Sequence, residues 1–228
     1  FRPVVFLTHG GEVAMFAALV LGAAGALWRM AEPRAQSLHL IAIGYLSVVV
    51  VLCKTVSAWA YGLFLVPAMM LFPRRLQLLA AAGLVGLTLL YPALRSLDLF
   101  PTEPILSVAS VVSEARAASL ETRFDEEQAL LDKALERPVF GWGSSGRNRV
   151  RDPDTGVDVS ITDGTWIIVL GIDGLVGFVG TFALMAMPVL LIWWRGGVAT
   201  PLATAALMLI LGVNMVDLLP NSSLWPTT

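Results

Sequence analysis

Six long apolar stretches limit what this chain can fold into. A helix that crosses a bilayer needs about 20 mainly apolar residues, and each of the six approaches that length. The stretches are residues 13–28, 38–53, 56–72, 76–94, 165–194 and 201–219. We therefore expect an all-α fold, a polytopic transmembrane helical bundle of about six spans.

The composition places the chain in the same class. Hydrophobic residues make up 57% of it and charged residues only 14%, whereas soluble domains have roughly 45–50% apolar and about 25% charged residues. This balance is typical of multipass membrane proteins, so membrane lipid is the first partner that it implies. We expect residues 1–228 to form a single membrane domain. Because the chain opens on Phe1 rather than Met, we also expect it to be part of a longer protein.

The fifth apolar stretch is too long for one straight span. It is interrupted by the motif GIDG at positions 171–174. Glycine is less favourable than alanine inside a helix by roughly 0.8–1 kcal/mol. The sequence therefore predicts a short half-helix, a break at this motif and a full-length span after the break.

The charges of the short loops predict the orientation. If the chain starts outside, the short outside segments hold only Arg2 and Lys54, while the inside loops hold more cations. These inside residues are Arg29, Arg34, Arg74, Arg75 and Arg195. Lys and Arg of short loops collect on the cytoplasmic side. The long segment 95–164 is therefore expected on the outer face, as one large extracytoplasmic loop.

Within this loop, residues 122–137 are expected to form an amphipathic helix. Thr122 can cap the helix, acidic residues fill its first turn, and Pro138 ends it. Four apolar residues at helical spacing give it one apolar face: Leu120, Phe124, Leu131 and Leu135. Such a helix is expected to lie on the membrane surface or on the outer end of the bundle.

Arg123 is out of place in this expected helix. At a helix start the macrodipole disfavours a cation by roughly 0.3–1 kcal/mol. The plain explanation is an ion pair with Glu127, four residues later, which contributes about 0.2–0.5 kcal/mol. Since that pair offsets only part of the cost, Arg123 is also a candidate for chemistry.

A glycine-rich turn follows the helix. Gly141, Gly143 and Gly146 can direct several backbone N–H groups toward one point, which is the geometry of an anion-binding nest. Three arginines come directly after it: Arg147, Arg149 and Arg151. Guanidinium groups bind phosphate through two parallel hydrogen bonds. The alternative is a flexible, solvated loop, and the motif is not a P-loop because it has no Gly-Lys-Ser/Thr.

Three aspartates complete the candidate residues. Asp163 lies where the loop meets the fifth apolar stretch, and its simplest role is to cap that helix. Asp173 and Asp217 lie at or near membrane depth, where acidic residues are functional candidates. The sequence has no cluster of His and Cys with metal-ligand spacing, so we expect neither a metal nor a cofactor.

Four motifs occur in order along the chain. They are FRPVVFLTHGGEVAMFAAL, CKTVSAWAYGL, SLETRFDEEQALLDKALERPVFGWG and DGTWIIVLGIDGLVGFVGTF. Together they resemble the O-antigen ligase and O-antigen polymerase family. In that family an Arg-Pro pair begins a span, a small polar hinge joins two spans, and an arginine precedes an outer-loop helix. A half-helix with a Gly-x-x-Gly break follows. The resemblance covers residues 1–194 and implies that the chain is the C-terminal half of such a protein.

The resemblance also implies a function. Members are metal-independent glycosyltransferases of the C type, which transfer or polymerise glycan from an undecaprenyl diphosphate carrier onto a glycan or lipid acceptor. They work at the outer, periplasmic or extracellular face of the bacterial cytoplasmic membrane, in the synthesis of lipopolysaccharide or exopolysaccharide. No nucleic-acid partner is expected.

The resemblance assigns roles to individual residues. Arg123, and with it Arg2, match the family arginines that bind the diphosphate. Arg147 and Arg149, which the glycine-rich turn points to rather than the resemblance, are expected to assist. Ligases of the family carry a histidine base at the position of Asp163. A carboxylate can also deprotonate a sugar hydroxyl, so Asp163 is a catalytic candidate beside Arg123. Because Asp163 stands in place of the ligase histidine, the sequence favours a polymerase-like or divergent member of the family.

Two other classes of function remain open from the sequence. The chain could be a transporter component, with Asp173 and Asp217 lining a path through the bilayer. It could also be a non-catalytic membrane scaffold in a polysaccharide-assembly system, in which case Arg123 would be dispensable.

Overall fold

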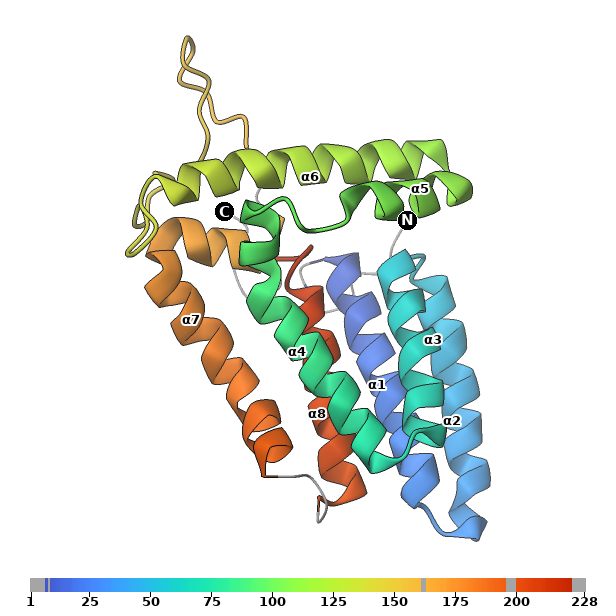
Figure 1. Cartoon of the computed structure of the whole chain (residues 1–228). Coiled ribbons are helices and arrows are strands. Elements are labelled where there is room, and N and C mark those ends of the chain that lie inside the picture. The colour runs from blue at the N-terminus through green and yellow to red at the C-terminus, as the bar shows by residue number, and fades with distance from the viewer. Residues whose placement is uncertain (1–6, 8, 161–162, 196–199, 223–228) are drawn as a thin grey trace. The chain divides into compact units, whose positions relative to one another are not determined.

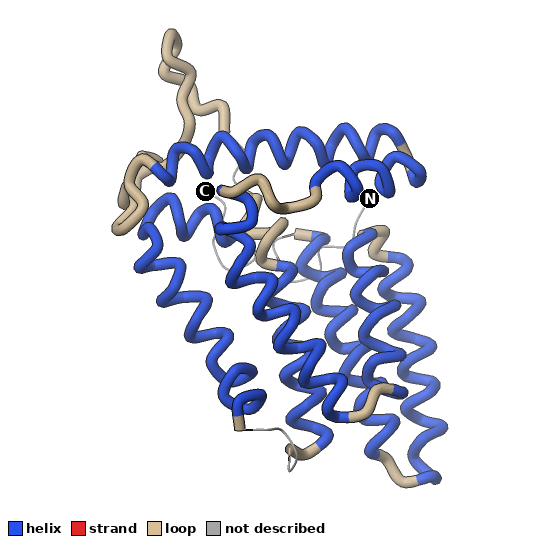
Figure 2. Tube along the Cα trace, viewed as in Figure 1, coloured by secondary structure: helices blue, strands red, loops and turns tan. Residues whose placement is uncertain are grey.

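The described part of the protein is mostly helical (Figures 1 and 2). A computed structural model describes residue 7 and residues 9–160, 163–195 and 200–222. Within these ranges it has eight helices and no β-strand: α1 (Gly10–Met30), α2 (Pro33–Leu52), α3 (Val56–Leu71), α4 (Arg74–Ser96), α5 (Thr102–Val112), α6 (Glu114–Leu135), α7 (Thr165–Trp194) and α8 (Leu202–Asp217). The predicted all-α fold class is confirmed for this part of the chain.

All six predicted apolar stretches are helical. Four of the helices, α1, α2, α4 and α7, are long and apolar enough to cross a membrane. The other two, α3 and α8, have 16 residues each. At 1.5 Å per residue they extend only about 24 Å, less than the roughly 30 Å hydrocarbon core. The number of helices that cross the bilayer therefore stays a prediction.

The backbone contacts divide the chain into two compact units, which we describe separately. The first unit comprises Phe1–Val85 and Met187–Met215, and the second comprises Gly86–Ala186 and Val216–Thr228. The prediction of one membrane domain over residues 1–228 stays a prediction. Every candidate residue of the loop belongs to the second unit.

In the first unit, small residues bring α1 close to α3. Gly22 and Gly25 of α1 lie against Leu65 and Met69 of α3, and a Cβ on Gly22 would come within 3.0 Å of the Leu65 side chain. Small residues are typical of helix contacts in membranes, where close packing replaces the hydrophobic effect. Arg29, in the last turn of α1, donates to the carbonyls of Met69 and Phe72, and so caps the C-terminus of α3.

In the second unit, α5 and α6 pack side by side (Figure 1). The amphipathic helix exists, but it begins at Glu114 rather than near Thr122. Thr122 lies inside α6, and its Oγ1 donates to the carbonyl of Ala118, so the predicted cap is wrong. The preceding sequence EARAASLE is rich in strong helix formers, which extends the helix toward its N-terminus. Arg123 therefore lies well inside the helix and not at its start.

Candidate functional site

The predicted break in α7 is present at Gly174. Its backbone adopts φ 67° and ψ −164°, a conformation open essentially to glycine alone. In an uninterrupted helix, the N–H groups of Leu175 and Val176 would bond to the carbonyls of Gly171 and Ile172. The break leaves these four groups in need of other partners.

The six residues 138–143, here called the PVFGWG turn, supply all four partners. Leu175 N–H donates to the carbonyl of Pro138 (2.7 Å) and Val176 N–H to that of Val139 (3.2 Å). In return, Trp142 N–H donates to the carbonyl of Gly171 and Gly143 N–H to that of Ile172, both at 2.8 Å. The turn that follows α6 is thus fastened to the bend of α7 through reciprocal backbone hydrogen bonds.

This close approach explains the first glycine of the turn. Gly141 has φ 65°, and a Cβ there would come within 2.5 Å of the Ile172 carbonyl oxygen. Its own N–H donates to the carbonyl of Arg137. Because the N–H groups of Gly141, Trp142 and Gly143 all bond to protein carbonyls, the predicted anion nest is wrong at these positions. Gly141 serves the contact between the turn and α7.

The arginines after the turn make local contacts. Arg147 Nε donates to the carbonyl of Ser144, and a guanidinium nitrogen of Arg151 donates to the carbonyl of Gly156. Arg149 pairs with Asp158 at 2.8 Å. Burial would raise the pKa of Asp158, but hydrogen bonds from Ser160 and Arg149 outweigh it and lower that pKa to about 2. Arg149 is therefore committed to its own loop, whereas Arg147 is exposed.

The structure brings together the two residues predicted to be catalytic. Arg123 of α6 lies 3.4 Å from an Oδ atom of Asp163, which precedes α7, and the two side chains are 51% and 42% exposed. The plain explanation for Arg123, a pair with Glu127, is not what forms, because Glu127 is engaged elsewhere. Arg2, the other predicted diphosphate ligand, lies outside the described residues.

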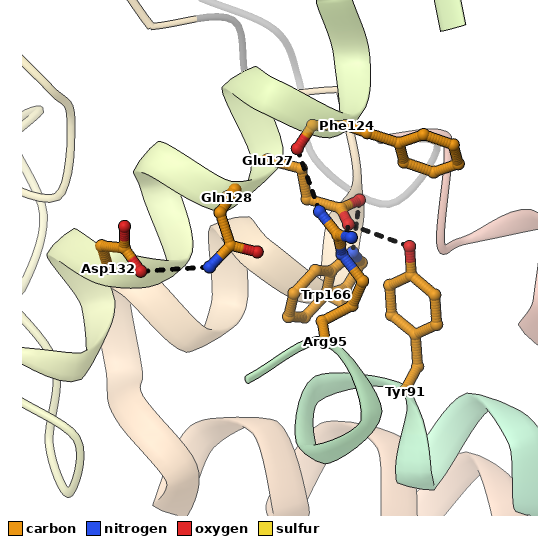
Figure 3. A network of polar contacts seen from close by, with 7 residues as sticks. All are labelled: Tyr91, Arg95, Phe124, Glu127, Gln128, Asp132 and Trp166. Atoms are coloured by element: carbon orange, nitrogen blue, oxygen red, sulfur yellow. Dashed lines mark hydrogen bonds and ion pairs between the residues drawn. The ribbon is translucent and has the colours of Figure 1, made fainter. Parts of the chain in front are cut away.

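Glu127 is the centre of a buried polar cluster that joins three helices (Figure 3). One carboxylate oxygen accepts hydrogen bonds from the Tyr91 hydroxyl and from Arg95 Nε of α4, both at 2.9 Å. The other oxygen accepts from Trp166 Nε1 of α7 at 3.3 Å. The side chains of Arg95 and Glu127 are only 7% and 14% exposed.

Aromatic rings enclose this cluster. The Arg95 guanidinium lies 5.4 Å from the centre of the Phe124 ring and donates to the Phe124 carbonyl. The Tyr91 ring packs edge-on against that of Trp166. Burial raises the pKa of Glu127, although the hydrogen bond from Tyr91 and the charge of Arg95 act against the rise.

The cluster fixes the position of the exposed pair. Arg123 and Glu127 are four residues apart and share one face of α6, while Asp163 and Trp166 lie together at the start of α7. A hydrogen bond between Glu127 and Trp166 therefore connects the two segments that carry Arg123 and Asp163. Nothing in the local sequence predicts this, since Glu127 is 32 residues from Arg95 and 39 from Trp166.

The other two candidate aspartates lie on α7 and α8. Asp173 is exposed in the bend of α7, and the buried Asp217 accepts a hydrogen bond from Asn221 at 2.8 Å. Among the described residues, no group of three or more His, Cys, Asp or Glu side chains is arranged to hold a metal ion.

No protein-family model matches this chain, and no curated protein or solved structure is significantly similar to it.

Proposed function

We propose that the chain is the membrane part of an enzyme that transfers or polymerises glycan from undecaprenyl diphosphate at the outer face of the bacterial cytoplasmic membrane. The observation that carries the proposal is the exposed pair of Arg123 and Asp163. The buried cluster that holds this pair includes residues of α4 and α7, two helices that are long and apolar enough to cross a membrane. A cation can stabilise a diphosphate leaving group without a metal, and a carboxylate can accept the proton of an acceptor hydroxyl.

In this proposal Arg123 binds the diphosphate. An exposed ion pair contributes only about 0–1 kcal/mol, so a doubly charged diphosphate can displace Asp163 from the guanidinium. Two parallel N–H···O bonds would then hold the phosphate oxygens. As the bond between the sugar and the diphosphate breaks, Arg123 stabilises the negative charge that develops on the leaving group.

Asp163 acts as the general base. Once released from Arg123, its carboxylate accepts the proton of the acceptor hydroxyl, whose oxygen bonds to the anomeric carbon as the diphosphate leaves. Arg147, which is exposed, is proposed to contact the same diphosphate. Arg149 would first have to leave its partner Asp158, so we propose that it contributes less to diphosphate binding.

Complementation of a deletion strain tests this function. The strain should lose its polymeric or ligated glycan and accumulate carrier-linked oligosaccharide, and the wild-type gene should restore the profile. A gene with Arg123→Ala should fail to restore it although the protein is present in the membrane. Restoration by Arg123→Ala would instead favour a non-catalytic scaffold or a transporter component.

A further inference from the structure

An apolar surface continues from α7 onto the PVFGWG turn. Val139 and Phe140 of the turn are 50% and 75% exposed. The hydrogen bonds between the turn and the bend place them next to Leu175 and Val176, the first residues after the break, which are also largely exposed. These four exposed apolar side chains are therefore carried by two hydrogen-bonded backbone segments at the start of the long part of α7.

The length of α7 locates this surface relative to a bilayer. Of its 30 residues, the 20 that follow Gly174 are apolar enough to span a membrane. At 1.5 Å per residue they extend about 30 Å, which matches the hydrocarbon core. The bend at Gly174 and the turn fastened to it then lie at the boundary between hydrocarbon and headgroups.

Two cations lie beside the same turn. The side chains of Lys133 and Arg137 are 3.8 and 4.2 Å from the centre of the Trp142 ring, and Trp142 Nε1 donates to the carbonyl of Lys133 at 2.7 Å. Lys133 Nζ also pairs with the carboxylate of Glu136 at 2.9 Å, a partner that a lipid phosphate would exchange. Tryptophan is enriched at membrane interfaces, and Lys and Arg near the surface are attracted to anionic lipids. Apolar side chains with cations directly beside them match the two layers of a lipid leaflet.

We propose that the PVFGWG turn is a membrane anchor for anionic phospholipid. Val139 and Phe140 insert into the edge of the hydrocarbon layer beside α7, and Arg137 and Lys133 contact the lipid phosphates. The turn thereby holds the C-terminal end of α6 at a fixed depth. This inference does not depend on glycan transfer.

Spin labels at single cysteines test the anchor directly. In a Cys53→Ala background, the cysteine of Phe140→Cys would carry a nitroxide in nanodiscs that contain phosphatidylglycerol. Power saturation should show that this label is more accessible to oxygen than to a water-soluble nickel chelate. Leu184→Cys, at an exposed position within the apolar part of α7, is the lipid control, and Ser145→Cys, in the exposed loop, is the water control.

Each alternative result would overturn the insertion. Nickel accessibility equal to that of the Ser145 label would place the turn in water. Low accessibility to both reagents would mean that protein, and not lipid, covers Phe140.

Native mass spectrometry tests the contact with headgroups. Arg137→Gln combined with Lys133→Gln should reduce the preference for phosphatidylglycerol over phosphatidylcholine severalfold, while Arg151→Gln, at an exposed arginine of the neighbouring loop, should leave it unchanged. An unchanged preference in the double variant would contradict the proposed role of the two cations.

Discussion

Two ion pairs on one helix differ in what they can do. Arg123 and Asp163 are exposed and 3.4 Å apart, while Glu127, one turn further along α6, is buried with Arg95. Loss of an exposed pair changes stability by about 0–1 kcal/mol, whereas removal of one partner from a buried pair costs about 3–5 kcal/mol. Glu127 and Arg95 therefore hold the structure together, and Arg123 is free to exchange its partner.

The first prediction concerns Arg123. Because a bidentate guanidinium contact depends on geometry, both Arg123→Ala and Arg123→Lys should reduce glycan transfer. Loss of a preorganised donor of this kind typically lowers the rate 10²–10³-fold. Asp132→Ala, at an exposed residue of the same helix that bonds only locally to Gln128, serves as the control. Equal and mild losses in all three variants, at normal membrane levels, would refute the catalytic role of Arg123.

Glu127 gives a prediction about pH. Burial raises its pKa above the ordinary value of 4.5, so the folded state holds this proton at a pH where the unfolded state has released it. Stability contributed by this group is complete below about 4.5 and is lost as the pH rises through the folded-state pKa. The melting temperature of Glu127→Gln should not show this pH-dependent decline, because an amide does not titrate in this range.

Asp158 is the control for this prediction, because its pKa is shifted in the opposite direction. Its pKa is lowered from 3.8 to about 2, so its contribution to stability is present above 3.8 and is lost as the pH falls toward 2. Asp158→Asn should therefore leave the melting profile between pH 4.5 and 7 parallel to that of the wild type. A decline in Glu127→Gln as steep as in the wild type would show that another group titrates there.

At the scale of elements, the bend of α7 and the PVFGWG turn form one structure. The turn bonds the backbone groups that the bend exposes, and the glycines Gly141 and Gly174 allow the two backbones to meet. The motifs GIDG and PVFGWG therefore have a shared structural purpose. Lipid at the bend could not supply such hydrogen bonds.

Substitution of these glycines tests whether the bend and the turn depend on each other. Gly174→Ala and Gly141→Ala each place a Cβ against backbone atoms of the other segment, in a conformation with positive φ. Each should lower the melting temperature and reduce activity. Gly180→Ala is the control, because Gly180 is helical and has open space around it, so alanine should stabilise it by roughly 0.8–1 kcal/mol. If Gly174→Ala and Gly141→Ala both behave like Gly180→Ala, the bend is incidental.

The sequence predicts some elements better than others. The apolar stretches and the break at GIDG were predicted correctly, because length and glycine position constrain a helix strongly. The helix α5 was missed: it is short, and Pro104 lies in its first turn, where proline is tolerated. The start of α6 was also misplaced, since Thr122 resembles a cap but the residues before it favour helix.

Two sets of contacts in the site could not be derived from the local sequence pattern. The family resemblance named Arg123 and Asp163 as catalytic candidates but did not predict their contact, and the Glu127 cluster was not anticipated. Both join residues more than thirty positions apart, from elements whose helical periodicity says nothing about their partners.

At the scale of the whole molecule, the orientation is a prediction of its own. Single cysteines at Ser145 and Asp154, in a Cys53→Ala background, should react with a membrane-impermeant thiol reagent in intact spheroplasts. A cysteine at Arg75 should not react, because the arginines of the short loops favour the cytoplasm. Protection at Ser145 and Asp154 together with labelling at Arg75 would reverse the orientation and remove the site from the outer face.

Release of undecaprenyl diphosphate by the purified protein tests the proposed function most directly. The full-length protein would be reconstituted in liposomes with the carrier-linked oligosaccharide that accumulates in the deletion strain. We predict that the wild type releases undecaprenyl diphosphate and joins the oligosaccharide to an acceptor, with EDTA present, and that Arg123→Ala slows release at least a hundredfold, as expected for loss of a preorganised donor. Release at the same rate by Arg123→Ala, or no release by correctly inserted wild-type protein, would contradict it.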